Sequence, residues 1–199
     1  MRIHLTGGVG AGKSTVLGFL ENEYGAKILR ADDLAKELME PGQEGYRKVV
    51  ELLGKDILAE DGTIDRAKMA QRIYSDENAR LGVNAIIHPI TWERIKREME
   101  EAGPRLVVAE AALPVDEAHR SMFDATWYVY TDPEVRIGRL MKSRGYSREK
   151  CIGIINSQMS DEEYRRRADA VIDNSGTHEE ARDQVREIME KLSGAFMRK

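Results

Sequence analysis

The stretch Gly7–Thr15 (GGVGAGKST) constrains this chain most, because it fits the pattern Gly, four residues, Gly-Lys-Ser/Thr of a phosphate-binding loop. Its glycines permit positive φ angles and let backbone N–H groups approach phosphate oxygens. In this pattern Lys13 reaches the β- and γ-phosphates of a nucleotide, and the hydroxyl of Ser14 binds Mg²⁺. We therefore expect magnesium as cofactor on Ser14, and nucleotide binding by Gly8, Gly10, Ala11, Gly12, Lys13, Ser14 and Thr15.

The flanking residues support this interpretation over a chance match by a glycine-rich turn. Arg2–Thr6 has the composition and alternation of a strand. After the loop, apolar residues at helical spacing precede a stop at Gly25. A phosphate-binding loop lies between a strand and a helix, and its helix adds a positive dipole end.

Composition narrows the class of protein. The chain has 199 residues, 41% of them hydrophobic, which is enough for one sizeable core. A formal net charge of −4 gives no general attraction to nucleic acid or anionic membranes. The one cysteine, Cys151, suits a reducing compartment, and no apolar run reaches membrane-spanning length. The first strand follows Met1 so closely that no signal peptide fits, so we expect a cytoplasmic protein that binds neither nucleic acid nor membrane.

Five predicted strands alternate with helices, which is typical of an α/β fold with a doubly wound parallel sheet. The strands are Arg2–Thr6, Ala26–Leu29, Arg105–Ala109, Ala125–Tyr130 and Ala170–Ile172. We interpret the chain as a single P-loop domain with its core in residues 1–40, 103–134 and 168–199.

Residues 41–102 are predicted to form an inserted, almost wholly helical substrate subdomain. Helices are expected at Glu44–Leu53, Asp65–Tyr74 and Asp76–Glu101, with proline kinking or ending the last one at His88-Pro89. This length exceeds what a crossover between two parallel strands requires.

Acidic residues follow two of the predicted strands. Asp32 and Asp33 come directly after the second strand, where open α/β sheets place ligands. Either residue could cap the helix predicted at Leu34–Glu40, and either could face the phosphates, and the sequence leaves both readings open. Glu110 closes the third strand, where an acid is more often an ordinary strand end than a group that holds a magnesium-bound water or ligand in place.

Residues 135–167 are predicted to form a helical lid. Its first helix runs to about Ser143 and a second covers Ser147–Met159. The first carries Arg136, Arg139, Lys142 and Arg144. Such charges often form only a solvated face, but in a phosphate-loop protein an arginine-bearing hairpin also brings cations over a transferring phosphoryl group. We favour the lid.

A series of segments, in order along nearly the whole chain, resembles the dephospho-coenzyme A kinase family. The segments are LTGGVGAGKST, RADDLAKELMEPG, DGTIDRAKM, the step at His88-Pro89, RLMKSRGYS, Gln158-Met159-Ser160 and ADAVIDNSG. The resemblance implies transfer of the ATP γ-phosphate to the 3′-hydroxyl of dephospho-coenzyme A, the last step of coenzyme A biosynthesis.

The resemblance also implies roles for single residues. Asp32 takes the place of the aspartate that orients the ribose hydroxyl, which makes it catalytic with Lys13 and Arg139. The remaining implied residues contact substrate (His88, Pro89, Asp116) or ATP (Arg144, Asn174 by the adenine). The sequence departs from the family at Arg30, where the family has an acid, at Asp116, which replaces a glutamate, and at Ser143, which stands where the second lid arginine is expected.

Two other functions remain to be weighed. A nucleoside monophosphate kinase would share the phosphate-binding loop, the lid and the acid after the second strand. Only the acceptor site therefore separates that function from phosphorylation of dephospho-coenzyme A. A GTP-dependent switch would need Asn-Lys-x-Asp for guanine, and the sequence contains no such tetrapeptide. We therefore favour a small-molecule kinase.

Overall fold

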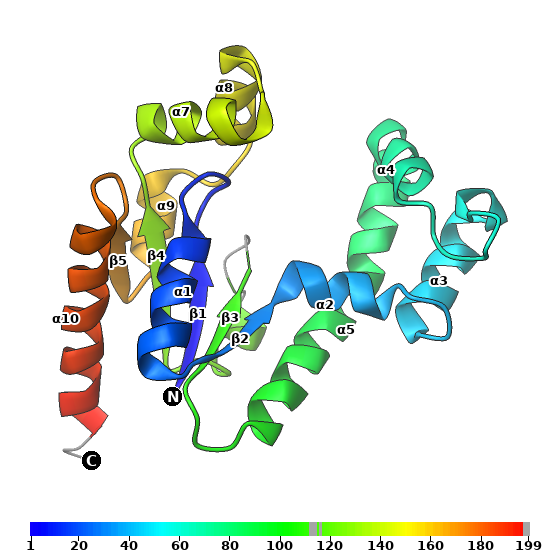
Figure 1. The fold of residues 1–199 in the computed structure, drawn as a ribbon. Helices are drawn as coiled ribbons and strands as arrows, with labels where there is room; N and C mark the ends of the chain where they lie inside the picture. The colour runs from blue at the N-terminus through cyan, green and yellow to red at the C-terminus, as the bar shows by residue number, and fades with distance from the viewer. Residues whose placement is uncertain (112–114, 116, 197–199) are drawn as a thin grey trace. The chain divides into compact units, whose positions relative to one another are not determined.

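The computed structural model describes residues 1–111, 115 and 117–196 (Figure 1). The chain divides into two compact units, one made of Met1–Leu29 with Ala102–Lys199 and the other of Arg30–Glu101. The first unit contains the sheet and the phosphate-binding loop, and the second is helical.

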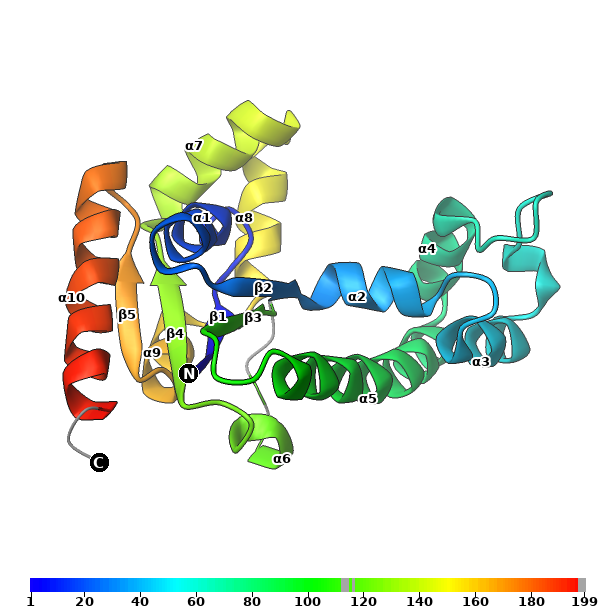
Figure 2. The same cartoon turned by 60° about the horizontal axis from the view of Figure 1, so that its bottom comes forward.

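The first unit is built on a five-stranded sheet with the order β2-β3-β1-β4-β5. Its strands are β1 (Arg2–Thr6), β2 (Lys27–Arg30), β3 (Val107–Glu110), β4 (Ala125–Tyr130) and β5 (Ala170–Asp173). The pairs β1–β3, β1–β4 and β4–β5 are parallel, so their carboxyl ends meet at one edge. The predicted doubly wound parallel sheet is confirmed, and Figure 2 shows the strands running side by side.

Alternation along the strands sorts side chains onto two faces of the sheet. On one face, Ile3, Leu5 and Trp127 pack against α1 (Lys13–Tyr24) and α10 (His178–Phe196) in the main hydrophobic core. On the other face, the Tyr128 ring stacks on Tyr164 of α9 (Asp161–Arg167), with ring centroids 4.7 Å apart. Each large apolar side chain that is fully buried stabilises the fold by about 1.5–3 kcal/mol.

A helical hairpin follows β4 in the first unit. It consists of α7 (Pro133–Arg144) and α8 (Arg148–Asn156), which begin after the N-caps Asp132 and Ser147. The two helices share a small core of Ile137, Leu140 and Cys151. The helix α9 was not predicted, and its three arginines, Arg165–Arg167, are exposed.

The second unit contains only helical elements: α2 (Ala31–Leu38), α3 (Glu44–Leu53), η1 (Lys55–Ile57), α4 (Arg66–Ser75) and α5 (Glu77–Glu101). Its core joins Val49, Ile57, Val83 and Ile87. Helix α2, assigned to the core domain from sequence, belongs to this unit, because Ala35 of the helix and Met39 just after its end pack on the same cluster.

Helix α5 does not end at the proline predicted to kink or end it. It runs unbroken from Glu77 to Glu101, with Pro89 inside it. Next to the proline, the hydroxyl of Thr91 donates a hydrogen bond to the carbonyl of Ile87, one turn earlier in the helix, at 2.8 Å. Tertiary packing of one apolar face therefore outweighs the local cost of proline in this helix.

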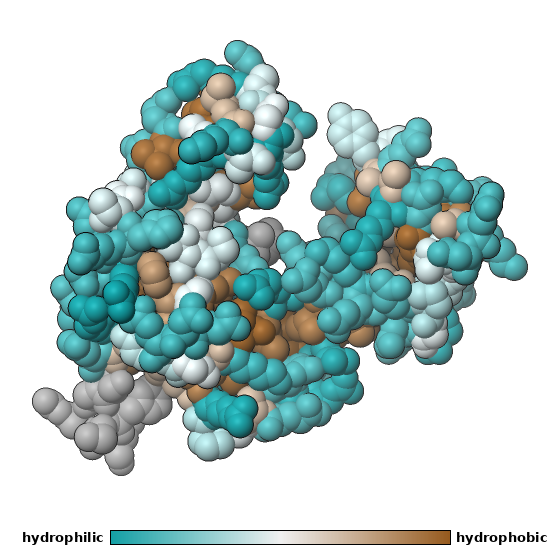
Figure 3. Space-filling model, viewed as in Figure 1, coloured by the Kyte–Doolittle hydropathy of each residue, from teal (hydrophilic) through white to brown (hydrophobic). Residues whose placement is uncertain are grey.

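The surface is predominantly hydrophilic on the face shown in Figure 3. Charged residues make up 33% of the sequence, and few large apolar side chains are exposed. Among the described residues, no helix has the length and apolar character needed to cross a membrane.

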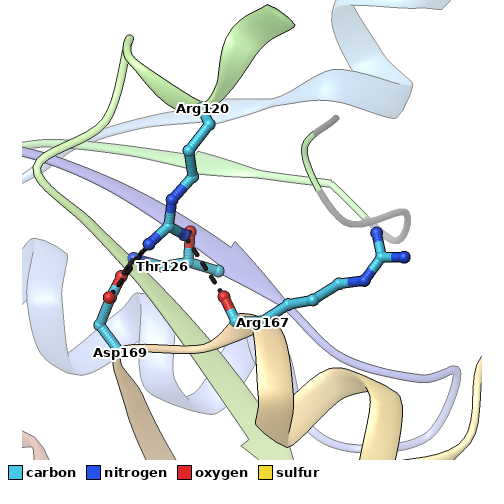
Figure 4. Close-up of polar contacts among 4 residues, drawn as sticks. All are labelled: Arg120, Thr126, Arg167 and Asp169. Atoms are coloured by element: carbon cyan, nitrogen blue, oxygen red, sulfur yellow. Dashed lines mark hydrogen bonds and ion pairs between the residues drawn. The ribbon is translucent and has the colours of Figure 1, made fainter. Parts of the chain in front are cut away.

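A polar network ties α6 (Glu117–Arg120) to the amino ends of β4 and β5 (Figure 4). The Nη2 atom of Arg120 lies 3.0 Å from both carboxylate oxygens of Asp169, and Nη1 donates to the Thr126 hydroxyl at 2.7 Å. The Asp169 carboxylate also accepts from the backbone N–H of Thr126 at 2.7 Å. One carboxylate thus joins a helix to the start of two strands.

We predict that Asp169→Asn lowers the free energy of unfolding by about 1–2 kcal/mol, because charge-assisted hydrogen bonds are lost from a half-exposed site. Urea denaturation measures this change. Asp183→Asn is the matched control, since in the described part of the chain its carboxylate pairs only with Arg186 on the same exposed helix face, and it should cost about 0.5 kcal/mol or less. Equal losses in the two variants would contradict the structural role of the network.

Candidate active site

The loop between β1 and α1 has the backbone geometry of an anion site. Gly10 and Gly12 adopt positive φ angles of 81° and 82°, which only glycine adopts without strain. Gly12 is the N-cap of α1, and no side chain caps this helix end. Among the described residues the N–H groups of Lys13 and Ser14 have no acceptor, so they remain available to an anion, together with the positive end of the helix dipole.

Lys13 is held at this loop by two oxygen atoms. Its Nζ donates to the carbonyl of Gly7 at 2.9 Å and lies 3.4 Å from the Oε1 of Glu110. Glu110 closes β3, which pairs with β1 in the register Leu5↔Glu110. Both side chains are mostly buried, so the ammonium group has one defined location within the first unit.

The next residue, Ser14, is exposed, and its hydroxyl forms no hydrogen bond among the residues that the structure describes. A free hydroxyl beside Lys13 has the position that a magnesium ligand requires in this motif. The described residues contain no group of three or more His, Cys, Asp or Glu side chains that could hold a metal ion.

The carbonyl of Ala11 anchors the loop to the carboxyl ends of β4 and β5. It accepts a hydrogen bond from the Thr131 hydroxyl and another from the Asn174 side-chain amide, each at 2.8 Å. Asn174 is 2% exposed, and a Cβ at Gly12 would collide with its amide nitrogen. The Asn174 side chain therefore supports the loop directly, a role that the sequence did not indicate, while its place beside adenine remains a prediction.

Arg139 lies beside these two residues. Its Nη2 donates to the carbonyl of Asn174 at 2.7 Å, and its Nη1 lies 3.3 Å from the hydroxyl of Thr131. The structure thus brings Arg139 to the phosphate-binding loop. Arg144 is exposed at the end of α7, with its guanidinium 6.0 Å from the centre of the Tyr146 ring.

Two further residues at the loop were missed as site residues. Arg136 is buried, and its Nε and Nη2 donate to the carbonyl of Val9 at 3.1 and 3.0 Å. The Oε1 of Gln158 accepts from Arg136 Nη2 at 2.6 Å and from the N–H of Val9 at 3.2 Å. Burial lowers the pKa of the Arg136 guanidinium from its usual value. Arg136 lies one helical turn before Arg139 on α7, so the spacing of basic residues along this helix could have indicated Arg136 as a site residue.

Asp32 belongs to the helical unit, where it lies in the first turn of α2. The sequence left open whether either acid caps this helix, and neither does, because the N-cap is Arg30 and no side chain makes a capping hydrogen bond. Within that unit the exposed Asp32 carboxylate forms no hydrogen bond or ion pair. Asp33 instead binds Lys36 at 2.6 Å, and this hydrogen bond lowers the pKa of Asp33.

Of the other residues expected to contact substrate, the structure describes only His88 and Pro89. His88 and Pro89 are exposed on α5 of the helical unit. Asp116 lies outside the described residues. Ser143, which stands where a lid arginine was expected, donates its hydroxyl to the carbonyl of Arg139 at 2.7 Å on the same helix.

Comparison with known proteins agrees with this site. The family described as dephospho-CoA kinase matches residues 1–180. A dephospho-CoA kinase from Carboxydothermus hydrogenoformans is 38% identical over 192 residues, covering 95% of this chain and 93% of that protein. A solved protein from Thermus thermophilus has a TM-score of 0.79 at 28% identity, covering 96% of this chain and 97% of that one. A dephospho-CoA kinase from Campylobacter jejuni shares the fold, with a TM-score of 0.73 at 21% identity over 98% of each chain. The chain belongs to the dephospho-CoA kinase family.

Proposed function

We propose that this protein transfers the γ-phosphoryl group of ATP to the 3′-hydroxyl of dephospho-coenzyme A, giving coenzyme A and ADP in the cytoplasm. The observation that carries the proposal is the family match over residues 1–180. The site supports it, because an uncapped helix start, a held lysine and a nearby arginine converge on one loop. Such an arrangement suits phosphoryl transfer by positioning and charge neutralisation.

We assign the binding of ATP, the phosphoryl donor, to the phosphate-binding loop and to Arg139 of α7. Lys13 would leave the Gly7 carbonyl for the β- and γ-phosphates, and the loop N–H groups would hold the remaining oxygens. Arg139 would turn its guanidinium from the Asn174 carbonyl to the transferring phosphoryl.

The metal would be held by the Ser14 hydroxyl and by phosphate oxygens of the nucleotide. Mg²⁺ retains several waters and uses few protein ligands in such sites, which fits a single exposed hydroxyl. When bound, the ion neutralises charge on the phosphates. Glu110 lies within reach of Lys13, so it would hold the lysine in place until the phosphates arrive.

The acceptor side is assigned to the helical unit. Asp32 would orient the ribose hydroxyl and accept its proton, since its carboxylate has no competing partner in that unit. His88 and Pro89 would contact the coenzyme A moiety, for which the large helical insertion supplies surface. In this proposal the chain is one kinase domain with a core, a substrate insertion and a lid.

The proposal is tested by incubating the protein with MgATP and a panel of acceptors, with products identified by mass. Dephospho-coenzyme A should be the best acceptor and gain one phosphate at the 3′ position, with adenosine and AMP much poorer in kcat/KM. Phosphorylation of AMP as efficiently as dephospho-coenzyme A would replace the proposal with a nucleoside monophosphate kinase.

A second prediction concerns Lys13. Lys13→Ala should lower turnover by about three orders of magnitude through loss of a fixed cation.

A separate prediction concerns the catalytic carboxylate. Asp32→Asn should lower kcat by roughly 10²- to 10⁴-fold, because the amide cannot accept the proton. The melting temperature and ATP affinity should stay close to wild type, since Asp32 neither caps α2 nor pairs within its unit. Steady-state kinetics and thermal unfolding measure both effects.

The matched control is Asp33→Asn on the same helical turn. It removes an exposed bond to Lys36 and should leave kcat within about twofold. If Asp32→Asn kept wild-type turnover, or if both variants lost activity equally, the role proposed for Asp32 would be wrong.

A further inference from the structure

Val9 at the tip of the phosphate-binding loop is bound on three sides by residues of the lid region. Its carbonyl accepts from both Nε and Nη2 of Arg136, at 3.1 and 3.0 Å. Its N–H donates to the Oε1 of Gln158 at 3.2 Å. Its side chain packs on the cluster of Ile137, Leu140 and Cys151 in the helical hairpin. Both backbone polar groups and the side chain of one residue are therefore fixed.

Arg136 has an unusual environment for a charged group. It is only 9% exposed and forms no ion pair with any carboxylate in the part of the chain that the structure describes. Its acceptors are one carbonyl and one amide oxygen. A buried charge without a counter-ion is costly, so good hydrogen-bond geometry must compensate for the lost hydration.

Contacts with the lid residues explain why two positions of the loop, 8 and 10, are occupied by glycine. A Cβ at Gly8, whose φ is not positive, would collide with the guanidinium of Arg136 and lie 2.7 Å from the Oε1 of Gln158. A Cβ at Gly10 would lie 3.0 Å from the Cγ of Leu140. The loop therefore needs glycine for its approach to α7 and Gln158 as well as for its approach to phosphate.

The direction of one peptide group follows from the contacts of Val9. In a trans peptide the C=O of one residue and the N–H of the next point in opposite directions. Because the Val9 carbonyl points at Arg136, the N–H of Gly10 points away from it. That N–H forms no hydrogen bond among the described residues, whereas the N–H of Val9 donates to Gln158 and the N–H of Ala11 donates to the carbonyl of Gly8 within the loop.

We propose that Arg136 and Gln158 are positioning residues that turn the Val9–Gly10 peptide so that the N–H of Gly10 is presented to a nucleotide phosphate. Arg136 fixes the carbonyl, and Gln158 holds both the guanidinium and the N–H of Val9. The inference rests on the proposed function for its ligand. Its test uses ADP and ATP binding alone, so it does not depend on which acceptor is phosphorylated.

The test combines calorimetry with ¹H–¹⁵N NMR on four variants of the full chain. Arg136→Met and Gln158→Met remove the polar groups at similar side-chain length, and Gln158→Glu keeps an acceptor for both bonds. In wild type, the Gly10 amide proton should shift strongly downfield when ADP is added. Arg136→Met should weaken ATP binding by about tenfold or more, the effect of losing one hydrogen bond to a charged group, and should reduce the Gly10 shift.

Gln158→Met should lose affinity in the same direction, and Gln158→Glu should restore it to within about threefold of wild type. Gln71→Met on the exposed face of α4 is the matched control and should bind ATP normally. An unshifted Gly10 amide in wild type would overturn the proposal, as would wild-type ATP affinity in Arg136→Met. If Arg136→Met does not fold, equal affinity in Gln158→Met and Gln158→Glu would overturn it instead.

Discussion

The structure of the nucleotide site depends on hydrogen bonds that hold two loop carbonyls from outside. Thr131 and Asn174 bind the carbonyl of Ala11, and Arg136 binds that of Val9. These side chains come from the carboxyl end of β4, the residue after β5, and α7, so the parallel sheet and the helix that follows it set the loop's shape. With the carbonyls engaged on the protein side, the N–H groups that remain free are left to an anion.

The same arrangement explains the distribution of charge. The chain as a whole is slightly acidic, yet Lys13, Arg136 and Arg139 lie around one loop. Only Lys13 of these three has a carboxylate within ion-pair distance among the described residues, that of Glu110. Local cations with few counter-ions create a positive potential where polyphosphate is expected, without making the protein generally basic.

The phosphate-binding loop and the parallel sheet could be predicted from the sequence because their signals are local. The glycine pattern, the strands and the helix start at Ser147 each depend on neighbouring residues, and the structure bears them out. Gln158 could not be found in this way, since it reaches Val9 across 149 positions through the fold of the hairpin. The sequence also could not decide whether Asp32 and Asp33 cap α2 or act in the site. A helix start is uncertain by one or two residues, so a carboxylate in the first turn cannot be told from an N-cap.

Because hydrogen bonds from outside the phosphate-binding loop hold its carbonyls, we expect the loop to be formed before nucleotide binds. Amide hydrogen exchange of the nucleotide-free protein, resolved by residue with NMR, tests it most directly. The N–H groups of Val9 and Ala11, which donate to Gln158 and to the carbonyl of Gly8, should exchange slowly, whereas that of Gly10 should exchange fast and slow down only with ADP. If all three exchanged at the rate of an unstructured chain until nucleotide was added, the loop would be ordered by its ligand and the claim would be wrong.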